Sequence, residues 1–312
     1  MAIGYRKRGP GKIPKRQLTF GAMRITVFSR GPGLYSTRRL VEAGRARGHT
    51  ISVVDHALCS PYLDSVRSSI LYEGVPLEIP DVAIPRIGAN ITTRGVALLR
   101  QLDVMGVPHL LPAEALLLAR DKMSCLQQLR QNGIDVPRTV LCFGLGEVRK
   151  AAKRLGPFPI VVKLLESTHG VGVALAQNLY QLERLAEGFL QLQDRVLLQE
   201  YIRESRGTDQ RAFVVGGRIV AAMERHAAAG EFRANIHRGA TASPLRLSAA
   251  DQELVLRVTE LIGVDVAGVD LISSKRGPLV MEVNASPGLE GIEGATEVDI
   301  AGAIIEYAER IA

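Results

Sequence analysis

Three oxygen-bearing side chains near the end of the chain have the types and spacing to bind a divalent cation. Two of them, Glu282 and Asn284, lie in a short apolar run that follows a Gly-Pro break and is expected to be a strand over 279–284. Successive side chains of a strand point to opposite faces, so Glu282 and Asn284 should share one face with Val280, about 7 Å apart. The other face should enter a core (Leu279, Met281 and Val283).

The third side chain, Asp270, lies in a second predicted strand at 266–272, directly before the first. If the two strands form a hairpin that turns near Lys275, Asp270 lies across from Met281 or Glu282, whereas a one-residue slip would move it to the wrong face. In the favourable register two carboxylates and one amide oxygen converge, and magnesium prefers such oxygen ligands together with water and substrate phosphates. The alternative is a buried hairpin whose polar side chains only pair with each other at the surface. This stretch alone does not decide between a metal site and such a hairpin.

A lysine and a glycine-rich segment form a second candidate site, this time for phosphate. Lys163 interrupts the apolar predicted strand 160–165, where a buried ammonium is costly without an anionic partner. The next segment, 166–172, contains two glycines and precedes another predicted strand at 173–176, so we expect a flap whose backbone amides close over phosphates. It is not a Walker loop, because no GK[ST] follows and no helix begins there. The flap alone is a weak signal, which Lys163 strengthens.

The stretch from 196 to 239 supplies candidate contacts to a nucleotide and to anions. The predicted strand 196–202 turns from apolar to polar at its end, where Glu200 is placed to accept a hydrogen bond from the exocyclic amine of adenine. A strand that simply leaves the core is the alternative for Glu200 and Tyr201. Four arginines stand at the ends of the elements that follow (Arg211, Arg225, Arg233 and Arg238). Guanidinium groups bind carboxylate and phosphate bidentately, so we expect at least two of the four to act in the site.

The N-terminal part of the chain alternates between strands and helices. Strands are predicted at 24–28, 50–54 and 81–86, and helices at 36–47 and 93–105. This alternation implies a parallel sheet with both faces covered. The first turn has no GxGxxG motif, so a dinucleotide site is not expected there. Three polar residues stand where strand ends open into loops, but we expect them to be surface positions (Tyr35, Ser36 and Arg86).

A single long helix is predicted at 113–132, because apolar residues recur there at helical spacing and Gly133 ends the pattern. This helix carries Arg120 and Lys122. A domain boundary is expected near 112–116, where the character of the sequence changes. We therefore predict a basic extension that is disordered, an N-terminal α/β domain and a larger C-terminal domain (1–22, 23–114 and 115–312).

Positive charge is concentrated at the N-terminus. The formal net charge is +7, and residues 1–22 hold six basic side chains and no acidic one, which leaves 7 − 6 = +1 for the rest. A Gly/Pro-rich tail of this kind cannot bury a core, although it could contact RNA or a ribosomal surface through phosphates. The favoured alternative is an extension upstream of the true first residue, Met23. Apart from this tail, direct nucleic-acid binding is not expected.

Composition excludes several classes of protein. Hydrophobic residues make up 46% of the chain, as in soluble α/β proteins. No apolar stretch is long enough to cross a bilayer, and no secretory signal is visible at the N-terminus. The three cysteines are far apart, which fits a reducing cytoplasm. Neither CxxC nor HExxH occurs, so we expect no structural zinc.

Taken in this order, these stretches resemble the ATP-grasp superfamily, and within it they are similar to the RimK family of α-L-glutamate ligases. The resemblance runs from about Met23 to the end of the chain. The motifs that carry it are Pro-Arg-Ile-Gly88, Ala-Arg-Asp-Lys122, Val-Val-Lys163, Thr-His-Gly-Val-Gly172, Asn-Ile-His-Arg-Gly239 and Met-Glu-Val-Asn-Ala-Ser-Pro-Gly-Leu-Glu-Gly-Ile292. Two positions depart from the family pattern: Ala240 stands where a second glycine is common, and His169 where Gln is common.

The resemblance implies an α/β (α+β ATP-grasp) fold, with an N-terminal parallel-sheet pre-ATP-grasp domain followed by a two-lobed ATP-grasp domain. It implies ATP and two Mg²⁺ or Mn²⁺ ions as cofactors. At matching positions the nucleotide would be bound by Lys122, Lys163, Glu200, Tyr201, Asp209, Arg233, Ala234 and Asn235, and the metal ions by Asp270, Glu282 and Asn284. The other arginines of the cluster would bind the reacting carboxylates (Arg211, Arg225 and Arg238).

The activity implied is ATP-dependent addition of L-glutamate to the C-terminal carboxylate of a small-subunit ribosomal protein, through an acyl phosphate. Three alternatives remain open: a different ATP-grasp carboxylate–amine ligase that acts on a small molecule or carrier protein, a glutathione-synthetase-like enzyme, and a non-catalytic ATP-binding module. We expect a cytoplasmic homo-oligomer whose partners are L-glutamate and the C-terminal tail of the ribosomal protein. We do not expect it to bind a membrane.

Overall fold

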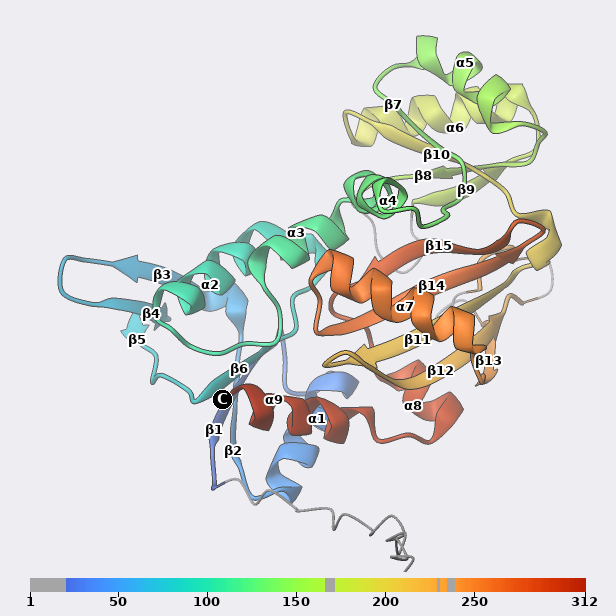
Figure 1. The fold of residues 1–312 in the computed structure, drawn as a ribbon. Helices are drawn as coiled ribbons and strands as arrows, with labels where there is room; N and C mark the ends of the chain where they lie inside the picture. The colour runs from blue at the N-terminus through green and yellow to red at the C-terminus, as the bar shows by residue number, and fades with distance from the viewer. Residues whose placement is uncertain (1–20, 166–171, 229–230, 235–238) are drawn as a thin grey trace, which may run out of the picture.

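The structure is a computed structural model that describes residues 21–165, 172–228, 231–234 and 239–312. Figure 1 shows an N-terminal domain built on a parallel sheet, a four-stranded lobe at the top of the view and a five-stranded lobe beside both. This confirms the predicted α/β fold. Two predicted site residues, Asn235 and Arg238, and most of the predicted flap (166–171) lie outside the described residues. Within the described ranges no helix is long and apolar enough to cross a membrane.

The N-terminal domain is centred on three short apolar strands in the order β2-β1-β6, all parallel as predicted. Alternating residues of these strands enter two different hydrophobic cores, so both faces of the sheet are covered. An antiparallel sheet of β3, β4 and β5 follows β2 and was not predicted. The elements are β1 (Arg24–Phe28), α1 (Tyr35–Ala46), β2 (Thr50–Val54), β3 (Cys59–Leu63), β4 (Ser68–Tyr72), β5 (Val75–Pro76), β6 (Val82–Pro85) and α2 (Thr92–Val104).

The rest of the chain forms two antiparallel sheets, each with helices on it. The four-stranded sheet has the order β7-β10-β8-β9 and packs against α5 and α6 around its own core. It consists of β7 (Thr139–Cys142), α5 (Leu145–Leu155), β8 (Ile160–Lys163), β9 (Val173–Ala176), α6 (Leu179–Leu192) and β10 (Val196–Glu200). The five-stranded sheet has the order β13-β12-β11-β14-β15. It comprises β11 (Thr208–Val215), β12 (Arg218–His226), β13 (Thr241–Pro244), α7 (Ala249–Ile262), β14 (Val266–Ser274) and β15 (Gly277–Asn284).

The hairpin of β14 and β15 has the register that the metal hypothesis requires, with Asp270 opposite Glu282. The alternation predicted for β15 is wrong in its first half. A bulge between Asp270 and Leu271 pairs Leu271 with Val280, so one extra residue, Met281, is accommodated in β15. Val280 therefore joins Val283 in the buried core instead of sharing the face of Glu282. A bulge of this kind changes the face of every residue before it, and alternation alone does not reveal it.

The single helix predicted at 113–132 is also wrong, because the chain forms two helices, α3 (Ala113–Arg120) and α4 (Lys122–Gln131). Asp121 separates them with an extended backbone, and its carboxylate accepts hydrogen bonds from the amides of Met123 at 3.0 Å and Ser124 at 2.9 Å. Asp favours this N-cap position over a helix interior, since its side chain competes for backbone amides. The break allows Arg120 and Lys122 to line the same cavity.

The C-terminal helices return to the N-terminal domain. After α8 (Glu290–Thr296), helix α9 (Ile300–Ile311) lies beside α1 and contacts β6, as Figure 1 shows for the red and blue helices. Near its end, the buried carboxylate of Glu309 accepts from Arg47 Nε at 2.7 Å and Nη2 at 2.6 Å, and contacts His49 Nε2 at 2.7 Å. The last helix of the chain therefore completes the first domain.

We expect Glu309→Gln to lower the free energy of unfolding by about 1–2 kcal/mol near neutral pH, because it removes charge-assisted hydrogen bonds while Arg47 keeps access to water. Urea denaturation measures this change. Hydrogen bonds from Arg47 hold the pKa of Glu309 below its ordinary value of 4.5. A carboxylate with a lowered folded-state pKa stabilises the fold above its unfolded pKa and loses that contribution as the pH falls.

The difference between Glu309→Gln and the wild type should therefore shrink below about pH 4.5. Glu306→Gln, on the same helix but at an exposed position 3.6 Å from Arg218, is the matched control and should change little. Equal losses in the two variants would contradict the role given to Glu309.

Candidate active site

A cavity of about 1040 Å³ lies where the N-terminal domain and the two lobes meet. Its walls come from the loops at the ends of β1 and β6, from β8 and β10 of the four-stranded sheet, and from β11, β12, β14 and β15 of the five-stranded sheet. Such a volume is at the upper end for small-molecule sites and has room for a nucleotide and a second substrate. Every described residue that the sequence singled out for ATP, metal or arginine chemistry lines this cavity.

Two of the three predicted metal ligands, Asp270 and Asn284, contact the guanidinium of Arg211, and the third, Glu282, contacts Asn284. Asp270 accepts from Arg211 Nε at 2.7 Å and from Nη2 at 2.6 Å. With its amide oriented to satisfy both neighbours, Asn284 donates to Glu282 Oε1 at 3.0 Å and accepts from Arg211 Nη2 at 3.2 Å. The positively charged guanidinium of Arg211 thus contacts one carboxylate and one amide oxygen of the proposed metal ligands. The donor set, two carboxylates and one amide oxygen, fits magnesium or manganese.

Asp270 is buried, and a second arginine helps to compensate its charge. Arg225 places Nη2 3.1 Å from Asp270 and donates from Nε to Asp209 at 2.6 Å. Burial by itself would raise the pKa of Asp270, but Arg211 and Arg225 hold it below its ordinary value. Burial raises the pKa of Asp209 to about 6, against the attraction of Arg225. Two carboxylates and two guanidiniums therefore form one network across β11, β12 and β14.

Both lysines reach the cavity from its opposite wall. Lys163, at the end of β8, donates to Gln199 Oε1 at 2.7 Å, and Lys122 at the start of α4 donates to the carbonyl of Leu165 at 2.5 Å. Burial lowers the pKa of Lys163 to about 8, although the negative charge of Glu282 acts in the opposite direction. A pKa of about 8 leaves the amine of Lys163 mainly protonated at pH 7 and mainly neutral by pH 9.

Of the residues predicted to contact adenine, Glu200 is the last residue of β10 and Tyr201 follows it directly. Glu200 is held by Arg138, whose backbone amide and Nε donate to it at 2.7 Å and 2.8 Å, and Arg276 also contacts it. Burial opposes the charge of Glu200, but these hydrogen bonds lower its pKa overall. Because both oxygens of Glu200 already accept hydrogen bonds, its side chain is less available to adenine than the sequence suggested. Tyr201 lines the cavity and stacks edge-on against Phe232.

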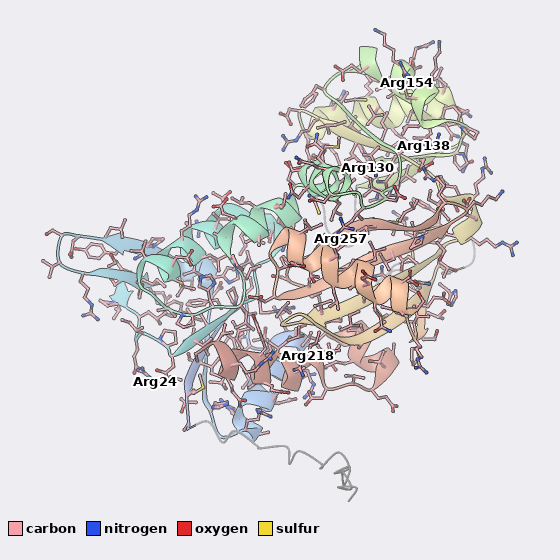
Figure 2. All side chains as sticks on the ribbon, viewed as in Figure 1. Arg24, Arg130, Arg138, Arg154, Arg218 and Arg257 are labelled. Carbon is pink, nitrogen blue, oxygen red and sulfur yellow. The ribbon has the colours of Figure 1, made fainter. Side chains whose placement is uncertain are left out.

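The predicted phosphate segment is described only in part. Arg233 donates to the carbonyl of Val173 at 3.0 Å, and Ala234 lines the cavity beside it. Glu231 accepts from Arg233 Nη2 at 2.5 Å, and this hydrogen bond lowers the pKa of Glu231 to about 2. Arg233 thus connects the end of the glycine-rich flap to the section after β12. Figure 2 labels six arginines on different parts of the chain, among them Arg24 on β1, Arg154 on α5 and Arg257 on α7.

The N-terminal domain contributes residues to the cavity wall that were not predicted from the sequence. Tyr35, Ser36 and Arg86, expected to be surface positions, line the cavity instead. Arg120 also lines it, although no role was assigned to it. The positions at strand ends were the available signal for the first three, and an Asp inside the predicted helix, Asp121, was the available signal for Arg120. Neither signal shows that the domains meet there.

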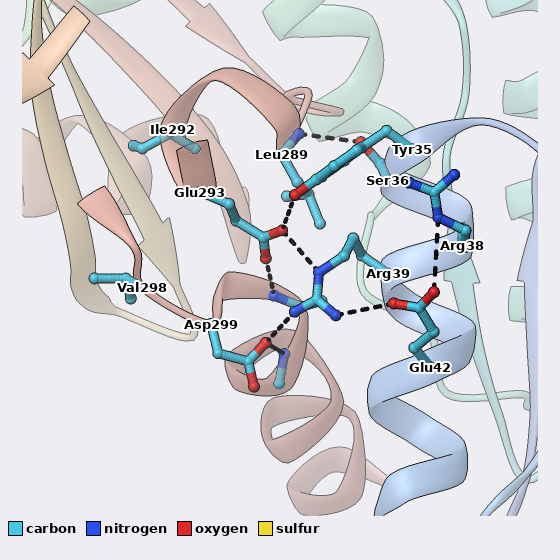
Figure 3. Close-up of polar contacts among 12 residues, drawn as sticks. Tyr35, Ser36, Arg38, Arg39, Glu42, Leu289, Ile292, Glu293, Val298 and Asp299 are labelled. Atoms are coloured by element: carbon cyan, nitrogen blue, oxygen red, sulfur yellow. Dashed lines mark hydrogen bonds and ion pairs between the residues drawn. The ribbon is translucent and has the colours of Figure 1, made fainter. Parts of the chain in front are cut away.

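Contacts from helix α1 fix the segment that follows β15, as Figure 3 shows. Ser36 Oγ accepts from the amide of Leu289 at 3.0 Å. The buried carboxylate of Glu293 accepts from Tyr35 Oη at 3.1 Å and from Arg39 Nε at 3.0 Å. The segment between Asn284 and α8 is thereby held against the N-terminal domain, where it forms part of the cavity wall.

The fold and the site define a protein of the ATP-grasp class: two antiparallel lobes with a lysine on one and a carboxylate–amide set on the other, behind a parallel-sheet domain. Comparison with known families identifies the branch. Residues 119–308 match the RimK-like ATP-grasp domain, and residues 23–116 match the RimK PreATP-grasp domain. The chain belongs to the RimK-like ATP-grasp family, and it is an ATP-dependent carboxylate–amine ligase.

Known relatives extend over nearly the whole chain. A probable alpha-L-glutamate ligase of Pseudomonas aeruginosa is 47% identical over 288 residues, covering 92% of this chain and 96% of that protein. The solved RimK domain protein from Sphaerobacter thermophilus is 25% identical, with a TM-score of 0.69 over 91% of this chain and 99% of that one. The ligase PsnB, solved with a minimal precursor, Mg and ADP, has a TM-score of 0.69 and 21% identity, covering 92% and 98%. ATP and magnesium are the usual cofactors of this family.

The lowered pKa of Lys163 generates a prediction about nucleotide binding. If the charged amine contacts ATP phosphates, the dissociation constant for ATP should rise about tenfold between pH 7 and pH 9, as the amine loses its proton above about pH 8. Calorimetric titration with a non-hydrolysable ATP analogue measures the change. In Lys163→Arg the charge persists at both pH values, so its pH dependence should be much flatter. An equally steep profile in the variant would contradict this assignment.

The metal assignment predicts that Glu282→Gln loses turnover by at least about 100-fold, since a bound metal contributes several kcal/mol to charge neutralisation in phosphoryl transfer. The rate should be followed as a function of magnesium concentration, because a lost ligand raises the concentration needed. Glu224→Gln, on β12 of the same sheet and outside the cavity, is the control and should keep its rate. A Glu282 variant with normal rates would rule out the metal assignment.

Proposed function

We propose that the protein adds L-glutamate to the C-terminal carboxylate of a small-subunit ribosomal protein, with ATP as the energy source. The observation that carries this proposal is the Asp270, Glu282 and Asn284 set, placed across one cavity from Lys163 and Lys122. The Pseudomonas relative, named a probable alpha-L-glutamate ligase, supports glutamate as the amino acid. The ribosomal acceptor rests on the resemblance of the motifs to the RimK family. We also propose that it acts in the cytoplasm as a homo-oligomer.

The chemistry proceeds in two steps that conserve charge and atoms. An oxygen of the acceptor carboxylate attacks the γ-phosphorus of ATP, the bond to the β,γ-bridging oxygen breaks, and an acyl phosphate and ADP form. The amine of L-glutamate then attacks the acyl carbon, phosphate leaves with its electron pair, and a proton leaves the nitrogen to give the amide. Neither step needs a nucleophile from the protein.

The side chains of the cavity supply what this chemistry needs, which is positioning and neutralisation of charge. Asp270, Glu282 and Asn284 would hold magnesium, which supplies positive charge to the phosphates when bound. Lys163 and Lys122 would contact phosphate oxygens from the opposite lobe. Arg211 and Arg225, already ordered by Asp270 and Asp209, would bind the reacting carboxylate and its phosphorylated form.

The test incubates the protein with ATP, magnesium, L-glutamate and a peptide that ends in Glu-Glu, and then measures peptide masses. Stepwise glutamyl additions are expected, together with one ADP for each addition. When hydroxylamine replaces glutamate, a hydroxamate of the peptide should form, because hydroxylamine traps acyl phosphates. ADP release only with a different amino acid or acceptor would overturn the proposal in favour of another ATP-grasp ligase, such as a glutathione-synthetase-like enzyme. No ATP turnover with any substrate would favour a non-catalytic ATP-binding module.

A further inference from the structure

Two arginines in the cavity wall have no carboxylate partner among the described residues. Arg86 follows β6 and donates from Nη2 to the carbonyl of Pro287 at 2.5 Å. Arg120 ends α3 and donates from Nη2 to the carbonyl of Ile87 at 2.6 Å. Each guanidinium therefore has a backbone acceptor that fixes its position. These contacts use only part of the five donors that each guanidinium carries.

Their surroundings leave hydrogen-bond donors unused. Arg120 Nε and the hydroxyl of Ser286 are buried and have no hydrogen-bond partner within the described part of the chain. Burial lowers the pKa of Arg86 to about 10, and the positive charge of Arg120 adds to this effect. Buried donors without partners cost free energy, as do two like charges in the wall of one cavity. An anion bound between them would remove both costs.

The contrast with the other arginine pair is informative. Arg211 and Arg225 contact Asp270 and Asp209 at 2.6–3.1 Å, so their charges are balanced within the protein. The charges of Arg86 and Arg120 are not balanced in this way, although both side chains line the same cavity. The unbalanced charge therefore faces the space in which the substrates must lie.

The position of this pair relates it to one substrate. Arg86 and Arg120 line the same cavity as Glu282, and the charge of Glu282 acts on Arg120. Arg86 contacts Pro287, in the segment directly after Asn284 that α1 holds in place. The acceptor carboxylate must lie at the proposed metal ligands to reach the γ-phosphate, which is where Arg211 and Arg225 lie. An incoming amino acid must lie beside it, and L-glutamate keeps two charged carboxylates throughout the reaction.

We propose that Arg86 and Arg120, together with the hydroxyl of Ser286, bind a carboxylate of the L-glutamate that supplies the amine. This assignment rests on the proposed ligase function and gives it a specificity determinant. Guanidinium groups match a carboxylate in geometry as well as charge, so an uncharged amide in place of the bound carboxylate would be a poor replacement. The pair acts on binding and orientation of the amine donor, and it takes no part in bond formation.

Steady-state kinetics of Arg120→Gln, Arg120→Lys and Ser286→Ala test the proposal. In Arg120→Gln the KM for L-glutamate should rise about tenfold or more, the effect of losing one charge-assisted hydrogen bond, while the KM values for ATP and peptide stay near normal. Arg120→Lys should recover part of the loss, and Ser286→Ala should show a smaller rise. Arg94→Gln is the matched control, because Arg94 also donates to a backbone carbonyl, that of Ala57, but at an exposed position outside the cavity.

Amide analogues identify the contact directly. L-Glutamine lacks the side-chain carboxylate and L-isoglutamine lacks the α-carboxylate, and wild type should discriminate strongly against one of them. In Arg120→Gln this discrimination should largely disappear. Unchanged discrimination, or a rise confined to the KM for ATP or for peptide, would overturn the proposal.

A binding measurement keeps this test separate from the proposed function. Thermal denaturation with an ATP analogue and magnesium, with and without L-glutamate, reports binding even if no ligation occurs. Stabilisation of wild type and of Arg94→Gln, but not of Arg120→Gln, would support the carboxylate subsite even if the ribosomal peptide proved not to be the acceptor. Equal stabilisation of all three proteins, or of none, would overturn it. A cooperative unfolding transition in each variant confirms that it is folded.

Discussion

The site depends on how the buried charge of Asp270 is balanced. A carboxylate in this position is tolerated because Arg211 and Arg225 contact it, and Arg225 is in turn held by Asp209. This network fixes three neighbouring strands at the level where Glu282 and Asn284 project. It also places a cation among the proposed metal ligands. A metal ion bound in place of that contact would free Arg211 for a substrate anion. Arg211 could therefore balance Asp270 when no metal is bound and bind the substrate when it is.

The cavity exists because segments far apart in the sequence meet at it. Helix α9 completes the core of the N-terminal domain, so the first and last parts of the chain fold against each other. Helix α1 holds the segment after β15 through Ser36 and Glu293. The cap at Asp121 divides two helices and brings Arg120 and Lys122 to one space. The N-terminal domain therefore contributes residues to the wall of the candidate active site.

The sequence was enough to predict which strand residues lie together, but not which segments enclose the cavity. The spacing of Glu282 and Asn284, and the position of Asp270 before a polar turn, were enough to predict one site, because a short hairpin leaves few registers. The prediction of one long helix was wrong at Asp121. The apolar spacing continues through this residue, but its side chain prefers to cap the N-terminus of a helix. The predicted alternation of buried and exposed residues in β15 was wrong at Met281, because a β-bulge cannot be recognised from residue composition. The places of Arg86 and Tyr35 in the cavity wall could not be predicted, because their partners lie more than 200 residues later in the chain.

Crystals grown with manganese and a non-hydrolysable ATP analogue would test the central claim most directly, because manganese can be located by its anomalous scattering. Manganese should be bound by Asp270, Glu282 and Asn284, with the analogue's phosphates reaching from this site towards Lys163 and Lys122. Manganese held elsewhere, with Arg211 still in contact with Asp270 and Asn284, would contradict this claim.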